Sequence, residues 1–353
     1  MKKKINIGII GGSGYTGLEL IKILSCHKYG NITLITSRSN DGKKIGDIYP
    51  ALKGTEYGEL LFTGDPLAAE YAGIDIIFLC LPPHKSMEHV KNIGQLGHMK
   101  IIDIGSDFRI NDPAVYLQWY GEGHMLPEML KDFTYGLPEI NSEKIKKSSH
   151  IANPGCYPTS VLLGLAPLLE SKYKVESIMI DSKSGVSGAG KKLKEMYLFG
   201  SLDDNFYAYS PTGHRHIGEM EQEIGKLAGR SLKIDFTPHL LPVSRGIFST
   251  IYCKIGNAEN ENIKESLNTI YEEYFSASTF IRFLGNTIPC MKDTIGTNLC
   301  MIGTAYDKRT GTLKIFSTLD NLLKGAAGQA VQNMNLLSGL DEKEGLELNG
   351  IFN

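Results

Sequence analysis

The sequence has neither an excess of charge of one sign nor a long apolar run. Its 37 lysines and arginines nearly balance its 39 aspartates and glutamates, and the formal net charge is -2 at pH 7. Without a basic block, neither a nucleic acid nor a membrane surface is expected as a partner. No apolar segment approaches the roughly 18 residues that a membrane-spanning helix needs. Asn6 and several glycines interrupt the apolar stretch after the first lysines, so no secretory leader is predicted.

The cysteines lack the spacing of a disulfide framework or of a metal site. The chain has 6 of them, without any Cys-x-x-Cys pair: Cys26, Cys80, Cys156, Cys253, Cys290 and Cys300. Several lie within apolar runs, which is typical of reduced thiols in a cytoplasmic protein. We therefore predict a cytoplasmic protein.

What the sequence does have, at its start, is a glycine-rich turn between a strand pattern and a helix pattern. Gly12, Gly14 and Gly17 fit the spacing G-x-G-x-x-G. Glycines at these positions let the backbone approach a pyrophosphate, which rests on the helix N-terminus. The alternative is merely a tight turn. We predict cofactor contacts along the whole turn: Gly11, Gly12, Ser13, Gly14, Tyr15, Thr16 and Gly17.

The second predicted strand, residues 32–36, ends in a polar triplet that bears on the choice of cofactor. The triplet consists of Ser37, Arg38 and Ser39. Sites that prefer NAD place an acidic residue near this position, whereas an arginine between two serines suits the 2′-phosphate of NADP. A solvated surface loop is the competing interpretation. We predict NADP(H) as the cofactor.

Two further apolar runs, residues 74–81 and 99–104, predict parallel strands that are covered on both faces. A helix over residues 84–96 is expected between them. Because loops at the carboxyl ends of parallel strands bind ligands in α/β sheets, we predict cofactor contacts at Leu81, Pro82, Pro83 and His84. Beyond the second run, Arg109 could clamp a carboxylate or phosphate, or could form an ordinary ion pair with a nearby aspartate.

Cys156 stands between a turn signal and an apolar helical pattern. The turn is Asn-Pro-Gly at 153–155, Pro158 suits a first helical turn, and the apolar run covers 161–169. Unpaired amides at a helix N-terminus stabilise a thiolate and could hold the oxyanion of a tetrahedral intermediate. An inert buried cysteine is the alternative, but this setting favours a nucleophile.

A glycine-rich loop, residues 183–190, follows a predicted strand over residues 177–182. Its backbone amides could bind a phosphate or the nicotinamide end of a cofactor, and we predict such contacts at Ser187 and Gly188. A plain connection is as compatible with the pattern.

Two histidines come next, at the start of a helical pattern that extends to Leu227. Imidazole exchanges a proton near neutral pH, so one of His214 and His216 suits acid/base work beside Cys156. With Glu219, the same histidines could instead ligate a metal, although no third cluster supports this. Arg215 could bind an anionic substrate group. We predict no metal.

The remaining patterns complete two domains. The predicted elements are two strands over 236–255, a helix over 260–275, a hairpin of 299–306 with 312–318, and a closing helix over 326–337. The predicted fold class is α/β: an N-terminal Rossmann-type dinucleotide-binding domain plus an α+β domain with a mixed sheet. We predict that residues 1–151 and 320–353 form the NADP-binding domain, and that residues 152–319 form the catalytic and oligomerisation domain.

These motifs, in this order, resemble those of the N-acetyl-γ-glutamyl-phosphate reductase family, within the aspartate-semialdehyde dehydrogenase superfamily. The resemblance covers nearly the whole chain and rests on eight motifs: residues 8–17, 81–84, 103–109, 135–139, 153–159, 184–190, 214–216 and 242–246. Only the C-terminal residues 346–353 follow the family pattern loosely. The resemblance implies that Cys156 forms a thioester, that His214 is the acid/base, and that Arg109, Ser184 and Arg215 lie near the substrate. Asn321, at the start of the closing segment, is predicted to contact the cofactor.

The reaction that the resemblance implies is NADPH-dependent reductive dephosphorylation of N-acetyl-glutamyl 5-phosphate to the 5-semialdehyde, a step of arginine biosynthesis. A thiol suits it because a thioester accepts hydride and a thiolate leaves readily. A homodimer or homotetramer is expected. A sister reductase of aspartyl or aminoadipyl phosphate is the alternative among enzymes. A nucleotide-binding regulatory module without catalysis is the alternative of another class.

Overall fold

The chain forms two compact units in the computed structural model, which describes residues 3–93, 99–191, 193–256 and 262–347. The first unit comprises Met1–Pro113, Glu122–Pro154 and Ala326–Glu347, and the second comprises Ala114–Gly121 and Gly155–Gly325. The predicted domains divide the chain differently, at 151/152 and 319/320, and group residues 114–121 with the nucleotide domain. The end of the predicted first domain, residues 348–353, lies outside the described residues.

The first unit is built on a parallel sheet of six strands in the order β2-β1-β3-β4-β6-β5. Its central strands are the apolar runs of the sequence, and Ile7, Ile77 and Ile102 are fully buried. The strands are β1 Ile5–Ile10, β2 Gly30–Ile35, β3 Ile76–Leu79, β4 Lys100–Asp103, β5 Phe133–Tyr135 and β6 His150–Ala152, and the helices are α1 Tyr15–Ser25, α2 Ile45–Ile48, α3 Ser86–Ile93, α5 Pro138–Lys146 and α10 Gly328–Leu337.

Helix α10 belongs to the first unit, to which the chain returns after crossing the second. Every residue of Gly328–Leu337 is buried, and the helix packs against α1, α5 and β4. The small residues in this segment, such as Ala330, permit the close approach that such burial requires. A π-helical turn, Leu323–Ala327, precedes the helix, so the predicted helix over 326–337 begins two residues too early.

The second unit carries a mixed sheet, as predicted, and its seven strands have the order β11-β12-β13-β10-β7-β9-β8. Two pairs, β7 with β9 and β11 with β12, are parallel, and the others are antiparallel. The strands are β7 Lys174–Gly185, β8 Tyr207–Ala208, β9 Ile234–Leu241, β10 Ile247–Gly256, β11 Ile281–Phe283, β12 Cys300–Asp307 and β13 Thr312–Leu319, and the helices are α4 Pro113–Tyr120, α6 Cys156–Leu169, α7 Phe199–Leu202, α8 His216–Ala228 and α9 Ile263–Phe275.

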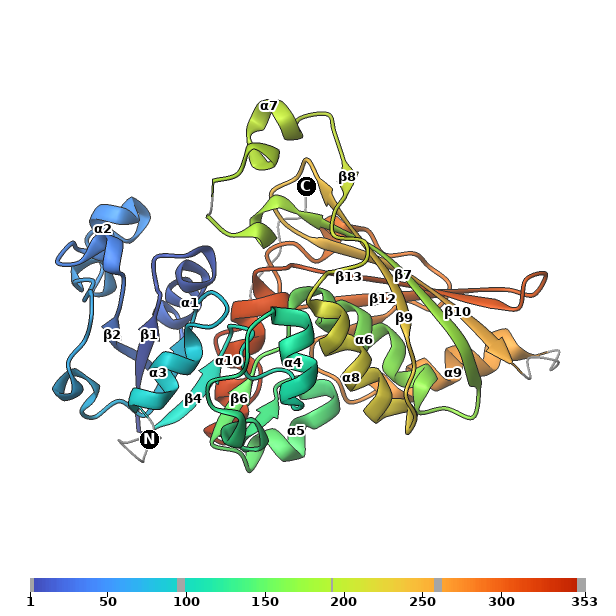
Figure 1. Ribbon diagram of the computed structural model, residues 1–353, viewed down its shortest axis with the longest axis horizontal. Helices are drawn as coiled ribbons and strands as arrows, with labels where there is room; N and C mark the ends of the chain where they lie inside the picture. The colour runs from blue at the N-terminus through green and yellow to red at the C-terminus, as the bar shows by residue number, and fades with distance from the viewer. Residues whose placement is uncertain (1–2, 94–98, 192, 257–261, 348–353) are drawn as a thin grey trace. The chain divides into compact units, whose positions relative to one another are not determined.

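Helix α6 lies at the centre of this unit, between the sheet and the helices α8 and α9 (Figure 1). Ser160 anchors it to the sheet, because its hydroxyl is hydrogen-bonded to Ser249 Oγ at 2.9 Å and to Ser317 Oγ at 3.0 Å. On the other side, Tyr271 of α9 donates to the carbonyl oxygen of Gly164 at 2.7 Å. All residues of α6 after Cys156 are buried. The helix is therefore held on two sides, and its first residue is fixed with it.

Several predicted bounds are wrong for reasons of tertiary pairing. The loop predicted at 183–190 begins as strand, since β7 pairs with β10 as far as Ser184 and with β9 as far as Gly185. The strand predicted at 74–81 is only Ile76–Leu79, because its pairing with β1 covers only these residues. The helices predicted over 84–96 and 260–275 are α3 and α9, and residues 94–96 and 260–261 lie outside the described residues.

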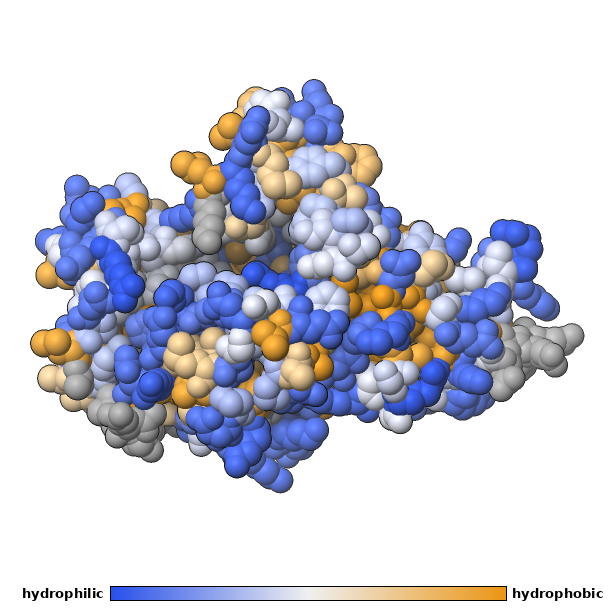
Figure 2. All heavy atoms as spheres, viewed as in Figure 1, coloured by the Kyte–Doolittle hydropathy of each residue, from blue (hydrophilic) through white to orange (hydrophobic). Residues whose placement is uncertain are grey.

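An excursion between β7 and β8 carries α7 and exposes large apolar side chains. Leu193, Phe199 and Phe206 are 92%, 80% and 60% exposed, and Figure 2 shows apolar atoms around this excursion at the top of the view. In the described ranges, no helix is both long enough and apolar enough to pass through a membrane.

Candidate active site

The glycine turn of the first unit has the close packing that the nucleotide motif predicts. A Cβ on Gly17 would lie 2.4 Å from the carbonyl oxygen of Gly12, and one on Gly12 would lie 2.4 Å from Ile35 Cγ1. Gly11 has a φ of +82°, which favours glycine. A Cβ on Gly14, in contrast, would meet only Gly11 O, at 3.8 Å. The backbone before α1 is therefore open to a pyrophosphate at Gly14, and the residues fit a dinucleotide.

The predicted NADP triplet lies beside this turn. Ser37 donates to Ser13 Oγ at 2.8 Å, which joins the end of β2 to the glycine turn. Ser37 and Ser39 hydroxyls are 3.3 Å apart. Arg38 is exposed, and its Nε lies 2.7 Å from Asp65 Oδ1, so the hydrogen bond with Asp65 raises the pKa of Arg38. The triplet thus offers two hydroxyls and one solvent-exposed cation next to the turn.

The loop after β3 is shaped by Asp107, whose importance the sequence did not indicate. Its Oδ1 accepts from the amide of His84 at 2.8 Å, and its Oδ2 accepts from the amide of Ser86 at 3.0 Å. The carboxylate thereby caps α3 and holds His84 at a φ of 68°. Asp103 is buried nearby, and burial together with the Asp107 charge raises its pKa to about 7. The buried carboxylates of Asp103, which ends β4, and of Asp107, which follows it, thus accept hydrogen bonds from the segment that follows β3.

Arg109 is buried, 7% exposed, and its guanidinium supports the backbone of the first unit. Nε donates to the carbonyl oxygen of Asn153 at 2.8 Å, and a terminal nitrogen donates to that of Ile104 at 2.9 Å. These bonds fix the segment that leads to Cys156. Contact with substrate stays a prediction for Arg109.

Cys156 is the first residue of α6, as predicted, and is half-buried among the groups of the second unit. Gly155 is the N-cap, and its amide donates to Glu219 Oε1 at 2.8 Å. Glu219 is completely buried. On another side, a Cβ on Gly325 would lie 2.8 Å from Cys156 Cβ. The sulfur-bearing residue is therefore held at a helix N-terminus, where amides face developing negative charge.

The two histidines lie close together but in different settings. Their ring centroids are 4.7 Å apart, and the His214 and His216 rings lie 5.6 and 6.0 Å from the ring of Tyr157. The backbone amide of His216 donates to His214 Nδ1 at 3.2 Å, so neutral His214 carries its proton on Nε2. Burial and the neighbouring Arg215 lower the pKa of His214 to about 4. His216 is the first residue of α8, on the same helix as Glu219.

The other predicted site residues of the second unit lie in or near the glycine-rich loop, some of them buried and some exposed. Ser184 is buried, and its hydroxyl donates to the carbonyl oxygen of Gly185 at 3.0 Å. Asn321 is also buried and binds Ser187 Oγ. Gly188 is exposed, as is Arg215 at the start of α8. The structure therefore brings Ser184, Ser187 and Asn321 together, with Gly188 on the surface above them.

Comparison with known proteins covers nearly the entire chain. Residues 6–148 match the family model "Semialdehyde dehydrogenase, NAD binding domain", and residues 156–321 match "Semialdehyde dehydrogenase, dimerisation domain". The N-acetyl-gamma-glutamyl-phosphate reductase of Pelotomaculum thermopropionicum is 44% identical over 350 residues, which is 99% of each chain. The chain belongs to the N-acetyl-γ-glutamyl-phosphate reductase family. The reductase of this family from Geobacter metallireducens is 45% identical over 346 residues, 97% of this chain and 98% of its own.

Solved structures more distant than the N-acetyl-γ-glutamyl-phosphate reductase family share the fold. Aspartate semialdehyde dehydrogenase II of Vibrio cholerae superposes with a TM-score of 0.71 at 18% identity, covering 95% of this chain and 98% of that one. The Candida albicans enzyme, whose structure was solved with NADP, gives 0.68 at 16% identity, with the same coverage. These likenesses confirm the α/β architecture of a dinucleotide-binding domain with a mixed-sheet domain.

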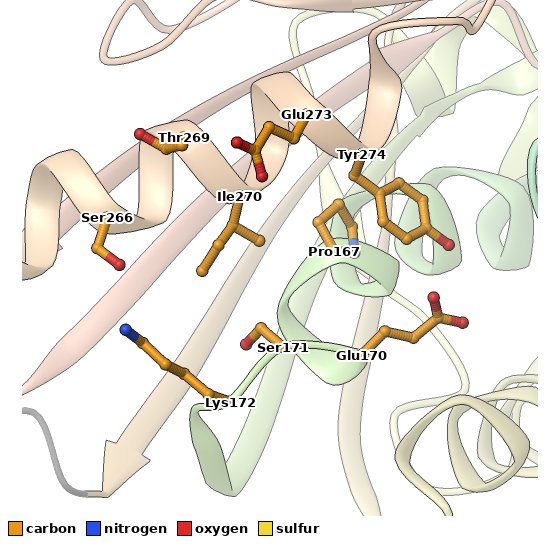
Figure 3. A pocket seen from close by; sticks show the side chains of 9 residues that line it. All are labelled: Pro167, Glu170, Ser171, Lys172, Ser266, Thr269, Ile270, Glu273 and Tyr274. Atoms are coloured by element: carbon orange, nitrogen blue, oxygen red, sulfur yellow. The ribbon is translucent and has the colours of Figure 1, made fainter.

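A surface groove of about 730 Å³ lies at the opposite end of α6 from Cys156. Figure 3 shows its lining, which comes from the end of α6, the residues just after it and one face of α9: Pro167, Glu170, Ser171, Lys172, Ser266, Thr269, Ile270, Glu273 and Tyr274. An α-helix of 14 residues is about 20 Å long, so the groove is separate from the thiol. Among the described residues, no three His, Cys, Asp or Glu side chains form a group suited to a metal ion.

The hydroxyls of Tyr157 and Tyr209 are a feature of the site that sequence reasoning missed. They are 3.0 Å apart, and burial raises the pKa of both tyrosines. Both therefore stay protonated beside His214 and act as hydrogen-bond donors. Tyr157 directly follows Cys156 in the sequence, which was the available signal; Tyr209 lies 52 residues away and gave none.

Proposed function

We propose that this protein reduces N-acetyl-γ-glutamyl phosphate to N-acetyl-glutamate 5-semialdehyde, with NADPH as reductant and a thioester at Cys156, in arginine biosynthesis. The observation that carries the proposal is the position of Cys156. It is the first residue of α6, in a chain that is 44% identical to a relative named for this activity. We also propose that the protein works in the cytoplasm, which suits its six free cysteines.

Acyl transfer to the sulfur is the first step. The Cys156 thiolate attacks the acyl carbon, a C–S bond forms, and the bond between that carbon and the phosphate oxygen breaks, releasing inorganic phosphate. Amides at the start of α6 face the oxyanion of the tetrahedral intermediate. Arg215, exposed at the start of α8, offers a positive charge to the anionic substrate. When bound, NADPH supplies the hydride that reduces the thioester carbonyl. Collapse of the hemithioacetal then frees the aldehyde and the thiolate.

Proton transfer is better suited to His216 than to His214, the residue that the family resemblance implied. The Nδ1 lone pair of His214 accepts a backbone amide, and its lowered pKa of about 4 keeps the ring neutral. His214 therefore suits the role of a neutral donor to an oxyanion. We propose His216, on the same helix as the buried carboxylate of Glu219, as the acid/base.

We propose NADP(H) rather than NAD(H) as the cofactor because of Arg38. Its ion pair with Asp65 is solvent-exposed on both sides, with 71% and 73% of the side chains accessible. An ion pair this exposed contributes little to the stability of the protein. A 2′-phosphate can therefore replace the Asp65 carboxylate as the partner of Arg38. The glycine turn, Ser37, Ser39 and the loop 81–84 would hold the remainder of the dinucleotide.

Replacing Arg38 with alanine is expected to raise the Kd of NADPH on the order of tenfold and to leave that of NADH nearly unchanged, because only NADPH offers a phosphate to the guanidinium. Fluorescence titration with each cofactor measures both constants. Asp65→Ala is the matched control, since it removes the competing carboxylate and should not weaken NADPH binding. Equal losses for NADPH and NADH in Arg38→Ala would remove Arg38 from the 2′-phosphate site.

A homo-oligomer accords with the match of residues 156–321 to a dimerisation domain. We propose a homodimer or a homotetramer, which sedimentation analysis distinguishes.

The substrate is tested by a panel of acyl phosphates assayed through NADPH oxidation. We expect turnover of the N-acetyl-glutamyl compound and at most weak turnover of the aspartyl and aminoadipyl compounds, which sister reductases use. Preferential turnover of either sister substrate would replace the proposed one. Binding of NADPH without turnover of any member would support a regulatory module instead.

A further inference from the structure

We propose that Trp119 is a positioning residue for α8, the helix that begins at His216. Trp119 belongs to α4, and its indole ring lies against Gly218 of α8. A Cβ on Gly218 would lie 2.3 Å from Trp119 Cδ1, 2.5 Å from Nε1 and 2.9 Å from Cγ. The ring therefore fills the space that any other residue at position 218 would need. Figure 1 shows α4 next to α8.

The start of α8 is enclosed all around. A helix at a protein surface usually buries one stripe of residues and exposes the others. In α8, however, the five consecutive residues 216–220 are all buried, and five consecutive residues point in every direction around a helix axis. Helix α6 and strand β9 cover part of this turn, and the indole covers Gly218. Glycine is a poor helix former, and the close approach of Trp119 explains why it stands here.

Trp119 is carried by a helix that is anchored in the second unit. Residues 114–121 belong to this unit, although the chain on both sides of them belongs to the first. Tyr116 is completely buried, and its ring stacks on that of Tyr120 at 4.5 Å. Residues three and four positions apart share one face of a helix, so Trp119 lies on the same face as these two tyrosines. The indole is thus held from its own side.

The turn under the indole also holds the nucleophile. Glu219 directly follows Gly218 and is completely buried, and its Oε1 accepts from the amide of Gly155 at 2.8 Å. Gly155 is the N-cap of α6 and directly precedes Cys156. A displacement of this turn therefore moves His216 and the cap of the nucleophile together. Displacements of about 1 Å in such supports can lower turnover on the order of a hundredfold.

The kinetic part of the test rests on the proposed reductase activity. Gly218→Ala directs a methyl group into the indole, and we expect its kcat to fall on the order of tenfold to a hundredfold because the turn is displaced. The Kd of NADPH should change less than about threefold, since the glycine turn lies in the other unit. Gly225→Ala is the matched control on the same helix. Its Cβ would meet only Arg230 O, at 3.6 Å, so its kcat should stay within about twofold of wild type.

A double-mutant cycle ties the effect to the ring. Trp119→Ala alone should lower kcat on the order of tenfold, because the turn loses its support. In the double variant with Gly218→Ala, the methyl group has room, so kcat should stay within about threefold of that of Trp119→Ala. Two independent defects would instead multiply.

Two further readouts need no substrate. Trp119 is the 1 tryptophan of the chain, so intrinsic tryptophan fluorescence reports on this ring alone. Its emission maximum should move to longer wavelength in Gly218→Ala, where the ring is pushed toward water, and stay unchanged in Gly225→Ala. In Gly218→Ala, the Gly155 amide should exchange its hydrogen on the order of tenfold faster, because its bond to Glu219 opens more easily. If no acyl phosphate is turned over, these readouts still decide the role of Trp119, so failure of the two proposals can be told apart.

The proposal is overturned if the emission moves in Gly218→Ala while kcat and the exchange of the Gly155 amide keep their wild-type values. The ring then swings aside, and the turn does not depend on it. Losses that multiply in the cycle overturn it as well. If Trp119→Ala does not fold, as judged by circular dichroism, Gly218→Ala and Gly225→Ala decide the question, and equal kcat values in these two variants overturn the proposal. If Gly218→Ala does not fold, Trp119→Ala decides it by the same kcat and exchange measurements.

Discussion

Replacing Cys156 with serine is expected to lower kcat by roughly three orders of magnitude or more, while the Kd of NADPH stays within about twofold. A serine hydroxyl is a far weaker nucleophile than a thiolate at neutral pH, and the helix N-terminus that stabilises the thiolate cannot ionise the alcohol to the same degree. The glycine turn lies in the other unit of the chain, so its own geometry does not depend on the sulfur. NADPH oxidation and cofactor titration measure the two quantities.

The control for this experiment is another cysteine of the same chain. Cys26 and Cys290 are exposed, and Cys290→Ser should retain turnover because it leaves α6 unchanged. Mass spectrometry of the wild-type protein, quenched during turnover, should find the acyl group on the peptide that contains Cys156. An acyl group on a different side chain, or substantial activity in Cys156→Ser, would contradict the nucleophile assignment.

The parts of the site that the sequence predicted are those that depend on neighbours along the chain. Gly12, Gly14 and Gly17 form a turn in which Gly17 packs against Gly12, only five positions away. Cys156 opens a helix because a turn precedes it and apolar residues follow. In both cases the determining contacts are local, so a single segment of sequence carries enough information.

The parts that the sequence did not reveal depend on contacts between distant segments. Asn321 bonds to residues 75 and 134 positions away, partners that the sequence did not indicate. Arg109 reaches the carbonyl of Asn153, 44 positions away, where an ion pair or a ligand clamp was expected. Strand β7 extends to Gly185 because β9 pairs with it there. Neither propensity nor spacing encodes such partners; only the folded arrangement does.

The choice between the two histidines shows how burial in the fold changes the chemistry of a side chain. As histidine side chains, both imidazoles suit proton transfer, so the residue type does not distinguish them. In the fold, however, burial and the charge of Arg215 depress the pKa of His214 to about 4, and the His216 amide occupies its Nδ1. A group with a depressed pKa of this kind is neutral at every pH above about 5. It therefore contributes no ionisation to a pH profile between about pH 5 and 9.

His216→Gln is accordingly expected to lower kcat by roughly two to four orders of magnitude, as loss of a general acid or base does. His214→Gln should lower it by about tenfold, since a glutamine amide still offers a neutral N–H donor. The pH profile of kcat/KM, measured from about pH 5 to 9, separates the roles: the limb that reports the proton carrier should persist in His214→Gln and be absent or displaced in His216→Gln. If His214→Gln removes that limb, then His214 is the proton carrier, and its ring must leave the amide of His216 during turnover.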